Sequence, residues 1–226
     1  MSGRSSRLGS AVALVALVAA CGTKGDAPAK KRVKGKPERV QVLAKFMVDN
    51  VPRPGVVPEC KDEDFVGGYP ITQLSLLLLG KALFDKEHPE RQTWMNPPEL
   101  EAPSVAVLLD DKASAEDKAY AAGEFVNAPF FVVYRVENAD APLALGVKEL
   151  KIGTVSTKII KYGKDTIPIC AKAFSFQNTK EKSDWAIEKS DKALVDPAIA
   201  QAMRDDLTAR WIELAPKVKA ASPTKP

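Results

Sequence analysis

The feature that most limits which residues can form a domain is an uncharged apolar run near the start of the chain. Residues 11–20 contain only Ala, Val and Leu, and two arginines, Arg4 and Arg7, precede them. A helix needs about 20 apolar residues to cross a bilayer, so a run of half that length favours a secretory signal peptide over a membrane-spanning helix. We therefore expect residues 1–20 to be removed before the rest of the chain folds.

A cysteine directly follows the small residues at the end of this run. The segment Val18-Ala19-Ala20-Cys21 resembles the lipobox of bacterial lipoproteins, and the likeness covers only residues 1–22. The resemblance implies diacylglycerol in thioether linkage on Cys21, cleavage before it, and often acylation of the freed amine, for example by palmitate. Gly22 in place of an acidic residue is similar to lipoproteins of the Gram-negative outer membrane. The alternative is a plain secretory signal with an incidental Cys21.

The resemblance places the domain in the cell envelope, facing the periplasm or the cell surface. Cys60 and Cys170 are then the only other cysteines, in a compartment that oxidises thiols. We predict that they form one disulfide, the alternative being two separate buried thiols. The bridge closes a loop of about 110 residues, for which chain entropy predicts about 4–5 kcal/mol of stabilisation. A zinc site is not expected, because His88 is the single histidine that could add a ligand.

The charge of the chain is unevenly distributed. Residues 22–39 carry seven basic and two acidic side chains, whereas residues 40–226 carry 24 basic and 27 acidic ones. We predict a lipidated, disordered tether at residues 21–37, one domain at residues 38–218 and a disordered tail at residues 219–226. Two interpretations of the basic tether stay open: attraction to anionic headgroups, and a spacer kept soluble by its charge. The mildly acidic domain gives no support for nucleic-acid binding.

Hydrophobic periodicity predicts an α+β domain with an antiparallel sheet of about four to six strands. N-terminal helices and a C-terminal amphipathic helix are expected to pack on this sheet. The predicted helices are residues 38–51, 70–84, 114–126 and 196–215. The predicted strands are residues 104–109, 130–137, 147–152, 154–162, 167–176 and 185–187. The hairpin of residues 154–162 and 167–176 is the strongest, and its short connection requires antiparallel pairing.

The sequence offers little for catalysis. It contains no dinucleotide-binding, phosphate-binding, zinc-protease or serine-hydrolase motif, and both mature thiols are assigned to the bridge. Paired carboxylates are the chemistry that remains, and Asp110 and Asp111 are adjacent residues that we interpret as surface charges. We expect no enzyme activity, no cofactor and no metal.

Two functions from different classes are consistent with these residues. The first is a non-catalytic envelope lipoprotein that binds a protein or polymer partner. The second is a lipoprotein that binds a small or lipidic ligand between sheet and helices, since Trp94, Trp185 and Tyr134 are candidate surface aromatics. A filled core would favour the first function, and a roomy cavity lined by these aromatics would favour the second.

Overall fold

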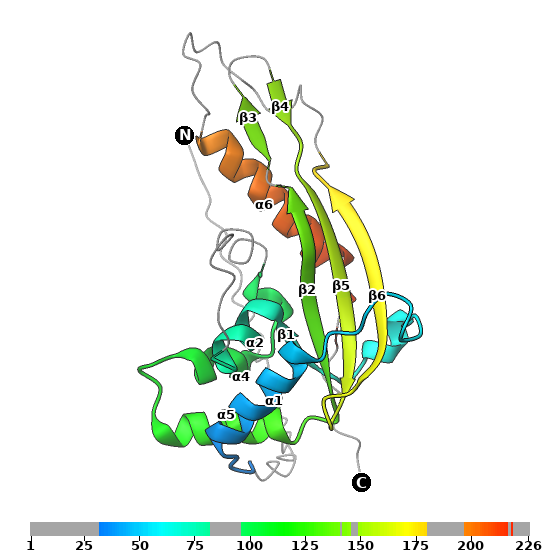
Figure 1. Cartoon of the computed structure of the whole chain (residues 1–226). Helices are drawn as coiled ribbons and strands as arrows, with labels where there is room; N and C mark the ends of the chain where they lie inside the picture. The colour runs from blue at the N-terminus through cyan, green and yellow to red at the C-terminus, as the bar shows by residue number, and fades with distance from the viewer. Residues whose placement is uncertain are drawn as a thin grey trace, which may run out of the picture. The chain divides into compact units, whose positions relative to one another are not determined.

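The computed structural model describes residues 32–81, 96–140, 142–145, 149–179, 197–216 and 218, which belong to one compact unit, Arg32–Pro226. Its centre is a four-stranded mixed sheet in the order β1-β2-β5-β6 (Figure 1). The strands are β1 (Tyr69–Thr72), β2 (Phe130–Asp140), β5 (Thr154–Gly163) and β6 (Pro168–Gln177). The predicted α+β class is confirmed. Within the described ranges, no helix is both long and apolar enough to cross a bilayer.

Three of these strands form the antiparallel part of the sheet. The predicted hairpin is confirmed as β5 and β6, which pair from Thr154↔Gln177 to Tyr162↔Pro168. β2 pairs with β5 on the other side and extends beyond the predicted strand to Asp140, with a bulge after Val136. Valine, isoleucine and aromatic residues dominate these segments because branched and flat side chains pack well on a pleated surface. A second, two-stranded sheet pairs β3 (Leu143–Leu145) with β4 (Glu149–Lys151).

The fourth strand corrects the predicted helix at residues 70–84. Tyr69–Thr72 forms β1, which pairs in parallel with β2, and helix α2 (Gln73–Leu79) begins only after it. Thr72 caps α2 by accepting a hydrogen bond from the Ser75 amide, at 3.4 Å. A leucine-rich run is ambiguous by periodicity, and here a capping residue divides it into a strand and a helix. Residues 80 and 81 follow the helix, and residues 82–84 lie outside the described ranges.

Residues 104–109, predicted as a strand, form a helix, and that prediction was wrong. Helix α4 (Pro103–Leu109) has proline in its first turn, a position that needs no backbone donor. Its buried residues, Ser104 and Val105, are adjacent rather than alternating, and Ala106 is exposed. Beta-branched valine gives only a weak preference, which packing against the next helix overrides.

Four helices cover one face of the sheet. They are α1 (Pro37–Asp49), α2, α4 and α5 (Ala115–Val126), which gather at one end of the strands (Figure 1). We call their interior the four-helix core; it includes Met47, Leu76 and Phe125 against Phe131 and Ile160. Tyr162 ties α1 to the sheet, because its hydroxyl donates to the Met47 carbonyl at 3.1 Å. Burial raises the pKa of Tyr162 to about 12.

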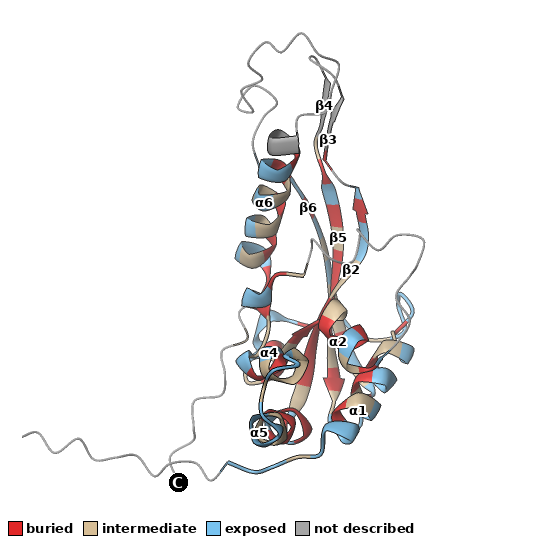
Figure 2. Cartoon of the chain, turned by 90° about the vertical axis from the view of Figure 1, so that its left-hand side faces the viewer, coloured by how far each residue is buried: buried red, intermediate tan, exposed pale blue. Residues whose placement is uncertain are grey.

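A single long helix covers the other face. Helix α6 (Pro197–Leu214) matches the predicted C-terminal helix, and its buried side faces the strands (Figure 2). Leu207 and Trp211 are fully buried with Val132, Ile159 and Phe176, and we call this cluster the α6 core. The short turns η1 (Asp62–Phe65) and η2 (Pro98–Leu100) each contribute one residue to it, Phe65 and Leu100. Alternate residues of β2 therefore enter two separate cores.

Candidate functional site

The predicted disulfide is present. Cys60 and Cys170 are bonded through their sulfurs with Cα atoms 5.2 Å apart, and both residues are buried. Residues 58–60 run beside β6, since the Cys60 amide donates to the Ala171 carbonyl and the Ala171 amide donates to the Pro58 carbonyl, both at 3.0 Å. The Asp64 carboxylate lies within 4.8 Å of both sulfurs. A disulfide offers no thiolate to a metal, so this cluster does not make a metal site.

Tyr134, one of the three candidate surface aromatics, is a core residue that is 1% exposed. Its hydroxyl donates to the Pro216 carbonyl at 2.9 Å, which fixes the chain after α6 against β2. Burial raises the pKa of Tyr134 well above its ordinary value. A cleft of about 260 Å³ borders it, between Glu101 and Ile212. The other two candidates, Trp94 and Trp185, lie outside the described residues.

The interior around the aromatic strand is filled. Phe131 packs against Phe125 with ring centroids 4.9 Å apart and against Tyr69 at 6.2 Å. The Tyr69 hydroxyl shares a hydrogen bond of 2.8 Å with the Ser104 hydroxyl, and burial raises the pKa of Tyr69. These contacts pack the described aromatic side chains of the four-helix core directly against this strand.

A groove of about 750 Å³ runs between α4 and α5. Its apolar lining consists mostly of small residues, including Ala106, Val107 and Ala121. Three carboxylates line it as well: Asp110, Asp117 and Glu124. Among the residues that the structure describes, Arg32 is the cationic member of this lining. The groove is therefore an apolar surface with a net negative charge, and we take it as the candidate site.

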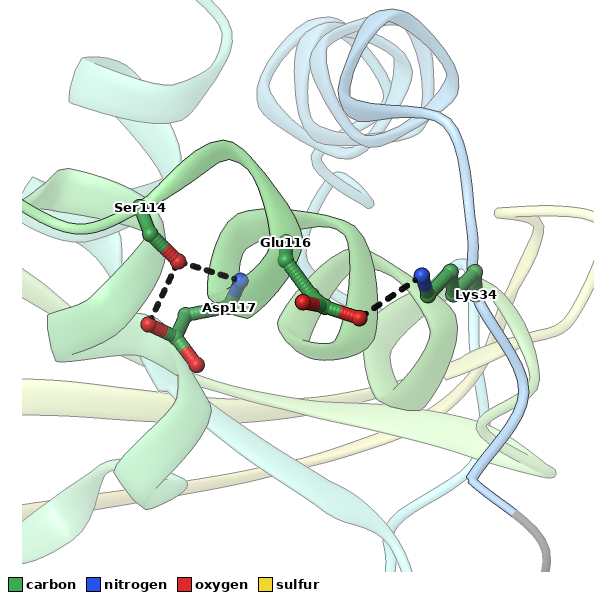
Figure 3. A network of polar contacts seen from close by, with 4 residues as sticks. All are labelled: Lys34, Ser114, Glu116 and Asp117. Atoms are coloured by element: carbon green, nitrogen blue, oxygen red, sulfur yellow. Dashed lines mark hydrogen bonds and ion pairs between the residues drawn. The ribbon is translucent and has the colours of Figure 1, made fainter.

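The helix α5 supplies one wall of this groove. Asp117, Tyr120, Ala121 and Glu124 lie at positions i, i+3, i+4 and i+7, which share one helix face. Ser114 caps the helix: its hydroxyl accepts from the Asp117 amide at 3.0 Å and donates to Asp117 Oδ2 at 2.6 Å (Figure 3). The bond from the Asp117 amide to the Ser114 hydroxyl confirms the predicted start of the helix, and the bond from that hydroxyl to Oδ2 fixes the Asp117 carboxylate at the groove.

The end of α4 supplies another carboxylate. Asp110 ends this helix, and its Oδ1 accepts from the Lys112 amide at 2.8 Å. Asp110 and Asp111 are exposed, as expected for surface charges, but Asp110 also lines the groove. The sequence did not single out Tyr120 or Glu124. Their spacing on a predicted helix was visible, but the neighbouring segment was assigned to a strand, so no second helix was expected beside them.

Residues 32–36, expected to belong to the tether, lie along α5. The Gly35 amide donates to the Ala119 carbonyl at 2.8 Å, and Lys34 Nζ contacts Glu116 Oε1 at 2.8 Å (Figure 3). A Cβ atom on Gly123 would collide with the Val33 carbonyl oxygen, so glycine permits this close approach. These contacts hold residues 32–36 against α5, and the compact unit begins at Arg32.

Two cations of this segment lie over one aromatic ring at the groove. Lys34 Nζ is 5.0 Å and the Arg32 guanidinium carbon 5.7 Å from the centroid of Tyr120. Both distances are within the range of cation–π attraction. The hydrogen bond between Lys34 and Glu116 raises the pKa of the lysine and lowers the pKa of the glutamate.

No protein-family model, curated protein or solved structure matches the chain. Function is therefore inferred from the residues and their geometry alone.

Proposed function

We propose that this protein is a lipid-anchored lipoprotein of the cell envelope whose domain is a non-catalytic binding module. The structural observation that supports lipid attachment is the pairing of Cys60 with Cys170. The chain has three cysteines, so the bridge leaves Cys21 as the remaining one, directly after the small residues Ala19 and Ala20. The bridge also fits an oxidising compartment, which is where lipoproteins of this kind fold.

The distance between anchor and domain follows from the chain length. Residues 22–31 separate Cys21 from the first residue of the compact unit, Arg32. Ten residues span at most about 35 Å when fully extended. A lipid on Cys21 would thus hold the domain within a few tens of ångströms of the membrane.

Partner binding is better supported than ligand storage. The side chains of the aromatic strand are packed in both cores, which supports a protein- or polymer-binding module over storage of a ligand beside this strand. The cleft beside Tyr134, of about 260 Å³, falls below the roughly 300–1,000 Å³ typical of small-molecule pockets, whereas the groove between α4 and α5, at about 750 Å³, falls within that range. The groove between α4 and α5 combines carboxylates with apolar residues, and none of the described residues in its lining is a histidine or a cysteine. Such a lining suits recognition of a partner better than chemistry.

Lipidation is tested on the full-length chain in a Gram-negative host. Wild-type protein is expected in the membrane fraction, with a mass increase on Cys21 that corresponds to the diacylglyceryl group and an added acyl chain. The Cys21→Ala variant is expected to lose both, because one or more missing lipid chains abolish stable anchoring. A double variant, Cys60→Ala with Cys170→Ala, serves as the control and is expected to keep the lipid. Unmodified, soluble wild-type protein would refute the proposal.

A further inference from the structure

We propose that the groove between α4 and α5 binds a lysine- or arginine-containing peptide segment of a partner protein. This inference rests on the proposed binding function and names the chemistry of the partner. Among the described residues, the groove is lined by three carboxylates, Asp110, Asp117 and Glu124, and by Arg32. The second cation at its Tyr120 ring, Lys34, is paired with Glu116, so the balance of charge stays negative. The groove is thus electrostatically complementary to a basic ligand.

The carboxylates keep acceptor capacity for such a ligand. Asp117 uses Oδ2 and Asp110 uses Oδ1 in the local hydrogen bonds that shape the helix ends. Glu124 is exposed and has no hydrogen bond or ion pair within the part of the chain that the structure describes. Each carboxylate accepts several hydrogen bonds, so all three are available to donors from outside the chain.

The apolar part of the groove fits the remainder of a basic side chain. Lysine and arginine lay their aliphatic stems on apolar surface while their charged ends stay hydrated. Ala106, Val107 and Ala121 provide that surface between the carboxylates. Tyr120 already has the chain's own Arg32 and Lys34 over its ring, which shows that cations are accommodated at this position.

The spacing of the carboxylates on α5 indicates a spacing for the ligand. Asp117 and Glu124 are seven residues apart, which is about 10 Å along a helix. A polyproline II peptide has three residues per turn and rises about 9 Å over them. Basic residues at positions i and i+3 of such a peptide therefore face the same side at nearly the same separation. We expect the groove to prefer this spacing over adjacent basic residues.

The probe is a fluorescently labelled synthetic peptide with the repeat Lys-Pro-Pro, titrated into the full-length protein in detergent and followed by anisotropy. The groove variant combines Asp110→Asn with Glu124→Gln, which keep the size and remove two charges. We expect at least tenfold weaker binding. The control combines Asp205→Asn with Glu213→Gln on α6, where both residues are exposed and far from the groove lining. We expect the control to change binding less than twofold.

Equal weakening by both double variants would overturn the proposal, because it would reflect net charge alone. A wild-type protein that does not bind the probe would overturn it too. A peptide of the same composition with its lysines adjacent is expected to bind at least threefold more weakly, and equal binding would refute the predicted spacing. Unchanged thermal unfolding of the variants shows that any loss is not caused by misfolding.

The chain's own basic segment is the rival occupant, and a third variant tests it. Lys30→Ser with Lys31→Ser removes two cations next to Arg32. Probe affinity within twofold of wild type supports a partner as the occupant. A gain of fivefold or more would mean that the chain's own segment fills the groove, and would overturn the proposal. Lipid on Cys21 is measured separately, so lack of peptide binding with lipidated Cys21 refutes the groove alone.

Discussion

The two faces of the sheet are stabilised in different ways. The four-helix core consists mainly of apolar and aromatic side chains, and in the described residues it has no covalent cross-link. The α6 core contains the disulfide, and polar contacts hold its helix at two places: Asn178 with Met203 in the first half of the helix, and Tyr134 with Pro216 just after it. Short helices that pack on one another bury apolar surface against each other as well as against the sheet. A lone helix buries only the one apolar stripe that faces the sheet. The disulfide is the clearest difference between the two faces, because the four-helix side has buried polar contacts of its own, Tyr162 with Met47 and Tyr69 with Ser104.

The polar contact near the start of α6 is fully satisfied. Asn178 Oδ1 accepts from the Gly153 amide at 2.8 Å, and its Nδ2 donates to the Met203 carbonyl at 2.8 Å and to Asp206 at 2.9 Å. Thr179 adds two hydrogen bonds to the same carboxylate. One buried side chain thus joins the end of β6, the residue before β5 and the helix.

The largest expected effect comes from removing the covalent link. Replacement of Cys60 and Cys170 by alanine together should lower the free energy of unfolding by about 4–5 kcal/mol, because the unfolded chain loses a long constrained loop. Urea unfolding measures this change, and Cys21→Ala serves as the control with no expected change. A loss below about 1 kcal/mol would mean that the two faces do not differ in their dependence on the bridge.

The next effect tests the polar contact on α6. Asn178→Ala should destabilise the protein by about 2–4 kcal/mol, since it leaves the Gly153 amide without its partner and removes the hydrogen bonds to the Met203 carbonyl and to Asp206. Asn127→Ala, on the four-helix side, removes one hydrogen bond to the Gly123 carbonyl from an exposed residue and should cost less than about 1 kcal/mol. Hydrogen exchange should rise in α6 for the first variant. Equal losses in both variants would contradict the comparison.

A smaller effect is expected where residues 32–36 contact α5. Gly123→Ala places a Cβ atom on the Val33 carbonyl oxygen and should release this segment from α5. The helix itself should gain about 1 kcal/mol from the higher helix propensity of alanine, so the net change in stability is small. Trypsin should then cleave after Arg32 or Lys34 several-fold faster. Gly55→Ala is the control, because its positive φ of 77° strains alanine in a loop away from the segment. Cleavage at the wild-type rate in Gly123→Ala would refute this contact.

The smallest effect concerns the exposed pair of Lys34 and Glu116. The lowered pKa of Glu116 means that its contribution is present above the ordinary carboxyl value and lost as pH falls through the folded pKa. The raised pKa of Lys34 means that its contribution is present below the ordinary amine value and lost as pH rises through the folded pKa. Added salt should weaken both contributions to stability, because it screens charges that are exposed to solvent. An NMR titration checks this: Lys34→Met should raise the pKa of Glu116, and an unchanged pKa would contradict the pairing.

The sequence allowed prediction of features that depend on short-range patterns. The β5–β6 hairpin, the helix that begins at Pro37 and the capped start of α5 follow from periodicity and from residues such as Ser114. The bridge followed from counting cysteines in an oxidising compartment. The helix predicted to begin at residue 70 and the strand predicted at residues 104–109 were wrong, because short apolar runs satisfy helix and strand patterns equally and packing decides between them.

The groove was not predictable from the sequence for a related reason. It requires that α4 is a helix, that α5 lies beside it and that Arg32 returns to the rim. Each of these depends on contacts between residues far apart in the chain, such as the Gly35 amide with the Ala119 carbonyl. Asp110 was visible as a charge, but its place beside Asp117 and Glu124 is a property of the fold.

The attachment of residues 32–36 to α5 changes where a pull on the N-terminal end would act. Tension arriving at Arg32 would load the Gly35–Ala119 hydrogen bond and the Lys34–Glu116 pair before it reached α1 at Pro37. These contacts would break first under tension. Their release would lengthen the tether by five residues, about 17 Å, without unfolding any helix. Arg32 also lines the neighbouring groove, so tension that releases residues 32–36 would at the same time change the lining of the groove.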